Sequence, residues 1–178
     1  MTEEDAQKIA NRRLKSRADD FLISLQDAHS EVLPGNHHPA ETVLLAYLMT
    51  AVDGYNQVEL HTRDWDSRPR PGFGTVLGYL VDVGRTLANF MLECRCNGHT
   101  RELAIIVDCE MPNVRTPWKQ RKETTLASLC SSVMIFSSEE ICADPESCAK
   151  RIEDQLFHLI EETMADAGML PRSPSPAS

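Results

Sequence analysis

Two cysteines and a histidine, Cys94, Cys96 and His99, have the close spacing of part of a metal site. A structural zinc ion needs four such ligands, and no second pair of cysteines or histidines at ligand spacing follows. We therefore interpret this segment as the tip of a hairpin. His37 and His38 directly precede a predicted helix and are interpreted as a polar cap.

A loop rich in proline and glycine, residues 63–74, places arginines beside two aromatic residues, Trp65 and Phe73. Arginine binds phosphate, and aromatic rings stack on unpaired bases, so the combination suits a nucleic acid. An ordinary surface loop has the same composition and is the competing interpretation. Together with two lysines farther along the chain, the candidate nucleic-acid contacts are Arg63, Arg68, Arg70, Lys119 and Lys122.

The net charge of −9 is unevenly distributed along the chain. Residues 1–60 carry −5, residues 61–122 carry +3, and residues 123–178 carry −7. A strong nonspecific nucleic-acid binder needs Lys and Arg to displace counterions from phosphates, and the overall acidity argues against one. Any basic surface is expected in the middle segment.

The length of 178 residues suits a single α/β domain with a hydrophobic core. We expect an N-terminal helix and linker over 1–36, the domain over 37–168 and a disordered tail over 169–178. No apolar run approaches the roughly 20 residues that span a bilayer, and the acidic N-terminus is not a signal peptide. A cytoplasmic protein with no membrane contact is expected, and its six cysteines should be reduced.

Hydrophobic periodicity predicts the element order α-α-β-β-β-α-β-α. Apolar residues three and four positions apart predict a helix over 3–30, and a largely buried helix follows from Pro39. A hairpin is expected around Gly84, and the apolar run 103–109 suits a central strand. The remaining expected elements are strands 76–83, 85–93 and 133–136, a helix over 116–131 capped by Thr116, and a last helix opened by Asp144 and Pro145.

Three stretches carry a resemblance to a known family. They are VGRTLANFML at 83–92, LAIIVDCE at 103–110 and KETTLASLCSSVMIFSSEEICADPESCA at 122–149. In this order the chain resembles the small endonuclease domains related to very-short-patch repair enzymes, within the PD-(D/E)XK superfamily. The resemblance covers roughly residues 39–156. It implies a restriction-endonuclease-like fold, a mixed sheet flanked by helices, and a Mg²⁺ site built from carboxylates.

The catalytic positions implied by the resemblance are altered in this chain. The aspartate of the family's hairpin corresponds to Asn89, and the glutamate of its next strand corresponds to Ile106. Asp108 is retained, and Glu41 matches a helix glutamate that helps to line the site in the family. Mg²⁺ needs hard oxygen ligands, and two of the expected charges are missing. We expect Asn89, Ile106 and Asp108 to lie together with Glu41 approaching, and no cofactor unless the protein is active, in which case Mg²⁺.

These residues favour a catalytically degenerate endonuclease-fold protein that binds a partner. The expected partner is a nucleic acid or a protein of a DNA-processing, mobile-element or defence system. Two alternatives stay open: an active metal-dependent endonuclease with migrated carboxylates, in which Glu41 and Glu110 would help Asp108 to hold the ion, and an acidic protein inhibitor of a nucleic-acid-binding protein. The sequence does not predict the oligomeric state.

Overall fold

The computed structural model describes residues 38–51, 57–60, 65, 72–109 and 116–170, and the predicted helix over 3–30 lies outside them. The described residues form two compact units. One contains 38–51, 107–109 and 136–151, and the other contains 57–60, 65, 72–106, 116–135 and 152–170. The elements are α2 (Pro39–Ala51), β1 (Gln57–Leu60), β2 (Phe73–Val83), β3 (Thr86–Cys96), β4 (His99–Asp108), α3 (Pro117–Leu129), β5 (Ser132–Ser137), α4 (Ser138–Ala143) and α5 (Pro145–Asp166).

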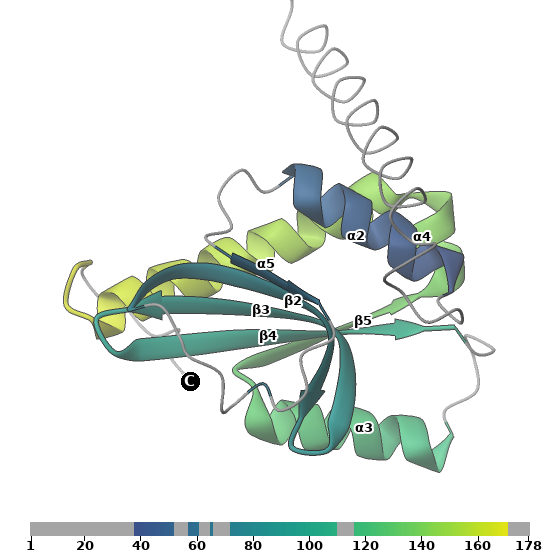
Figure 1. Ribbon diagram of the computed structural model, residues 1–178, viewed down its shortest axis with the longest axis horizontal. Helices are drawn as coiled ribbons and strands as arrows, with labels where there is room; N and C mark the ends of the chain where they lie inside the picture. The colour runs from purple at the N-terminus through teal and green to yellow at the C-terminus, as the bar shows by residue number, and fades with distance from the viewer. Residues whose placement is uncertain (1–37, 52–56, 61–64, 66–71, 110–115, 171–178) are drawn as a thin grey trace, which may run out of the picture. The chain divides into compact units, whose positions relative to one another are not determined.

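A mixed five-stranded sheet with the order β1-β2-β3-β4-β5 forms the centre of the larger unit (Figure 1). β1 pairs in parallel with β2, whereas β2, β3 and β4 form an antiparallel meander. The prediction of an α/β protein with a mixed sheet flanked by helices is confirmed at this level. The order of elements differs from the predicted one because β1 and α4 were not predicted.

Two tight turns set the register of the meander. Gly84 and Arg85 have φ of 53° and 68°, and Asn97 and Gly98 have φ of 48° and 85°. Two consecutive positive φ angles are typical of type I′ turns, whose twist matches that of paired strands. The predicted hairpin around Gly84 is therefore confirmed, and a second one extends the strands beyond their predicted limits.

Polar residues lie at the starts of α2, α3 and α5. In the smaller unit, His38 Nδ1 accepts the Ala40 backbone N–H at 3.3 Å, which confirms the predicted polar cap at this residue. α5 opens at Pro145, as predicted, after Asp144. α3 has Thr116 at its N-cap and Pro117 in its first turn, but the Thr116 side chain forms no capping hydrogen bond. The helix start was predicted correctly and the capping contact was not.

Each unit has its own packing. In the larger unit, α3 covers one face of the sheet, where the core consists of Trp65, Val76, Val81, Val83, Ala88, Met91, Ala104, Ile106, Leu126 and Cys130. Residues 152–166 of α5 lie on the opposite face, where Asp166 binds Arg101 of β4 with an N–O distance of 2.7 Å (Figure 1). In the smaller unit, α2 buries Leu44 and Leu48 and packs against α4.

Among the described residues, no helix combines the length and apolar character needed to cross a membrane.

Candidate functional site

Two of the positions that the resemblance assigns to catalysis lie side by side in the sheet. Phe90 pairs with Ile105 and Met91 with Ala104 across β3 and β4. The same register, continued by one residue, sets Asn89 opposite Ile106. Directly opposed residues of antiparallel strands project from the same face. The larger unit therefore brings these two side chains together on the face that α3 covers.

Ile106 is a packing residue. Its side chain is 7% exposed and belongs to the core cluster with Met91, Ala104 and Leu126. An alkyl side chain offers no oxygen to a metal ion, and its burial excludes water from the position at which the resemblance predicts a carboxylate. The expected packing role of Ile106 is confirmed; its correspondence to a catalytic position of the family stays a prediction.

The Asn89 side chain forms a hydrogen bond with a lysine of the same chain. The side chain is 6% exposed, and its Oδ1 accepts a hydrogen bond from Lys122 Nζ at 3.4 Å. Lys122 is half-buried on the inward side of α3, one turn before the buried Leu126. The amide oxygen that could replace the missing carboxylate therefore faces an ammonium group.

The two carboxylates that the resemblance retains belong to the smaller unit. Asp108 is the last residue of β4 and is partly exposed. Glu41 is 8% exposed in the first turn of α2, and its backbone N–H donates to the His38 carbonyl at 2.9 Å. Among the described residues, no group of three or more His, Cys, Asp and Glu side chains is placed to hold a metal ion.

Cys94, Cys96 and His99 lie in the second hairpin, as the sequence predicted, and Cys96 pairs with His99 across it. Burial, helped by the negative charge of Glu93, raises the pKa of Cys94 to about 12. A thiol must lose its proton to bind zinc, so this shift opposes metal binding. Cys96 is also buried, and its Sγ lies 3.1 Å from the Sδ atom of Met169. The segment is a structural hairpin tip.

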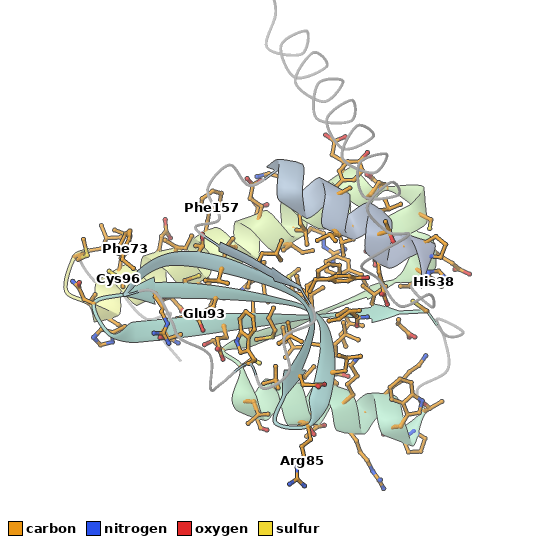
Figure 2. The ribbon with its side chains drawn as sticks, in the orientation of Figure 1. His38, Phe73, Arg85, Glu93, Cys96 and Phe157 are labelled. Atoms are coloured by element: carbon orange, nitrogen blue, oxygen red, sulfur yellow. The ribbon has the colours of Figure 1, made fainter. Side chains whose placement is uncertain are left out.

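Trp65 belongs to the core and cannot stack on bases, which corrects that part of the interpretation of the arginine-rich loop. Its side chain is 0% exposed, and its Nε1 donates to Glu102 Oε1 at 3.0 Å. The indole fills the space above Gly78, where a Cβ atom would lie 2.4 Å from the ring. Phe73 stays 63% exposed at the start of β2 (Figure 2). Arg63, Arg68 and Arg70 lie outside the described residues.

Sequence reasoning missed a pair of glutamates on the same face as Asn89. Glu93 and Glu102 are paired across β3 and β4, and Glu93 is 0% exposed. Arg95 Nε binds Glu93 Oε1 at 2.9 Å, while Glu102 accepts from the Trp65 indole. The signal was the four-residue spacing of Glu93 from Asn89, which puts both on one face of a strand. Glu102 is therefore part of the packing around Trp65, and Glu93 is part of a buried ion pair with Arg95.

A second missed feature is a pair of exposed side chains on α3. Trp118 is 51% exposed and Arg121, three residues later, is also exposed. The three-residue spacing of an aromatic residue and an arginine in a predicted helix was the signal in the sequence, and it is weaker than that of the loop at 63–74, which holds more arginines. Lys119 and Lys122, the two predicted contacts in this region, are half-buried on the same helix.

Comparisons of the chain with protein-family models, with curated proteins and with solved structures found no match.

Proposed function

We propose that this chain is an endonuclease-like protein that has lost its metal site and acts by binding a partner, a nucleic acid or a protein of a DNA-processing, mobile-element or defence system. Two features support the proposal. The three sequence stretches keep the family's order, and the side chains at its two carboxylate positions, Asn89 and Ile106, lie side by side but carry no charge.

The contact between Lys122 and Asn89 is the observation that carries the proposal. A nuclease needs a divalent cation to polarise the phosphate and activate water. Two unit charges about 4 Å apart interact by roughly 4 kcal/mol near a protein surface. An ammonium group at the Asn89 oxygen would therefore repel a divalent ion that bound there. A neutral amide and an isoleucine do not compensate for that repulsion.

The competing explanation is an active enzyme whose carboxylates have migrated. Among the described residues, Glu93 and Glu102 also lie on the Asn89 face and are candidates for such a migration, whereas Glu110 lies outside the described residues. Glu93 is engaged by Arg95 and Glu102 by Trp65, so both have structural contacts in place of metal ions. This arrangement favours the metal-free interpretation over the migrated site.

We expect no cleavage when the purified protein is incubated with single- or double-stranded DNA in the presence of Mg²⁺ or Mn²⁺. The physical reason is the loss of two anionic ligands. Gel analysis of end-labelled substrates measures this, with Asp108→Ala purified in parallel to identify contaminating nuclease. Cleavage by the wild-type protein that disappears in Asp108→Ala would overturn the proposal. Equal trace cleavage by both preparations would come from a contaminating nuclease and would agree with the proposal.

A further inference from the structure

α3 and the turn beside it carry exposed side chains that the degenerate site does not use. They are Trp118 and Arg121 on α3 and Arg85 at the turn between β2 and β3, and we call this set the α3 surface. All three residues are exposed and belong to the larger unit. Neither arginine forms an ion pair with any residue that the structure describes.

Trp118 and Arg121 are neighbours on the helix. Side chains three residues apart lie on the same face, with Cβ atoms about 5–6 Å apart. The chain has two tryptophans, one 0% exposed and the other, Trp118, 51% exposed. An aromatic ring in water beside a guanidinium group can offer a flat apolar face and a charge to the same ligand.

Arg85 extends this surface to the other end of the helix. A Cβ atom on Gly84 would lie 2.7 Å from Leu129 Cδ1, so the turn rests against the last turn of α3. Figure 2 shows Arg85 projecting from the tip of this turn, away from the strands. Trp118 and Leu129 are about 16 Å apart along the helix axis at 1.5 Å per residue. Arg121, eight residues before Leu129, lies about 12 Å along the helix axis from the turn that carries Arg85.

The charge of this region is opposite to that of the chain as a whole. The first half of α3 contains three basic residues, Lys119, Arg121 and Lys122, and one acidic residue, Glu123, and its first turn has no acidic residue. Lys122 faces inward to Asn89, so Arg121 and the partly exposed Lys119 supply the positive charge at the surface. The positive end of the helix dipole adds to these charges. In a protein of net charge −9, such a surface is complementary to a polyanion.

We propose that the α3 surface binds single-stranded nucleic acid, with a base stacked on Trp118 and phosphates bound by Arg121 and Arg85. This inference rests on the proposed function and names its partner. A single strand fits better than a duplex because the faces of paired bases are already stacked on one another, whereas an unpaired base has a free face for the indole. Phosphate contacts from arginine then fix the backbone without selecting a sequence.

The test uses the full chain and a labelled oligothymidylate of about 20 nucleotides, with a duplex of equal length as competitor. We expect saturable binding that weakens steeply with salt, and weaker binding of the duplex. Trp118→Ala should reduce affinity on the order of tenfold because stacking on one base is lost. Arg121→Ala and Arg85→Ala should reduce both the affinity and the salt dependence.

The matched control is Phe157→Ala, which removes an aromatic side chain of equal exposure, 52%, from the acidic helix α5. It should leave binding unchanged. Tryptophan fluorescence gives an independent readout: oligothymidylate should quench the wild-type signal, and the quenching should vanish in Trp118→Ala because Trp65 is buried.

Absent binding, equal binding by Trp118→Ala and wild type, or preference for the duplex would each overturn this inference. Failure of the proposed function looks different, because it appears as metal-dependent cleavage that requires Asp108. If the α3 surface does not bind a single strand and the protein does not cleave DNA, the inference is wrong, whereas the metal-free protein remains and has another partner.

Discussion

Replacing Trp65 with alanine is expected to lower the free energy of unfolding by about 3–5 kcal/mol, the range for large aromatic residues removed from a core. The indole is 0% exposed, packs into the space above Gly78 and donates a hydrogen bond to Glu102. Alanine would leave a cavity and remove the donor from a partly buried carboxylate. Urea unfolding followed by far-ultraviolet circular dichroism measures the change without depending on tryptophan emission.

Trp118→Ala is the control, because the same change at an exposed position should stay within about 0.5 kcal/mol of wild type. Gly78→Ala gives a second check. A methyl group at Gly78 would lie 2.4 Å from the Trp65 ring, so it should destabilise the wild type more than it destabilises Trp65→Ala. Additive effects of the two substitutions, or a Trp65→Ala protein as stable as wild type, would show that the indole does not fill this space.

Replacing Ile106 with glutamate is expected to destabilise the protein by a few kcal/mol at neutral pH, because a charge enters the core at that position. The ammonium of Lys122, which donates to Asn89, would offset only part of this cost. Burial should raise the pKa of the new carboxyl group above its value in the unfolded chain. The loss of stability should therefore be small below about pH 4, where the group is protonated in both states, and should grow as pH rises.

Ile106→Val is the matched control and should cost about 0.5–1.5 kcal/mol at any pH. Melting temperatures of wild type and both variants, measured from pH 4 to pH 7, give the comparison. A melting temperature that Ile106→Glu leaves unchanged at pH 7 would mean that water or a cation reaches this position, and the packing role of Ile106 would then be wrong.

Much of the sheet could be predicted from local patterns. The apolar run 103–107 is buried as a central strand should be, and Gly84 marks a turn. The ends of the strands were harder to predict. β4 starts four residues earlier than the predicted strand, in the polar segment from His99 to Glu102. Those residues form a strand because the Asn97–Gly98 turn and pairing with β3 hold them there. Pairing across strands is not visible in the periodicity of one segment.

The candidate site was predictable where strand alternation decides it, and unpredictable where contacts between distant segments decide it. The resemblance and the i, i+2 rule placed Asn89 and Ile106 on one face. The contact from Lys122 depends on how α3 crosses the sheet, so that lysine was predicted as a phosphate ligand. Trp65 was assigned to a surface loop by composition, although a glycine on a separate strand, Gly78, makes room for its indole in the core.

The central claim is that no divalent metal site remains, and direct titration with Mn²⁺ tests it most directly. Electron paramagnetic resonance of free Mn²⁺ would be recorded for wild type, for Asp108→Ala and for Asp82→Ala, in which an exposed carboxylate of β2 is removed. We expect weak binding to surface carboxylates that the two variants reduce equally. One tightly bound Mn²⁺ per chain in the wild type and in Asp82→Ala, absent in Asp108→Ala, would contradict the account.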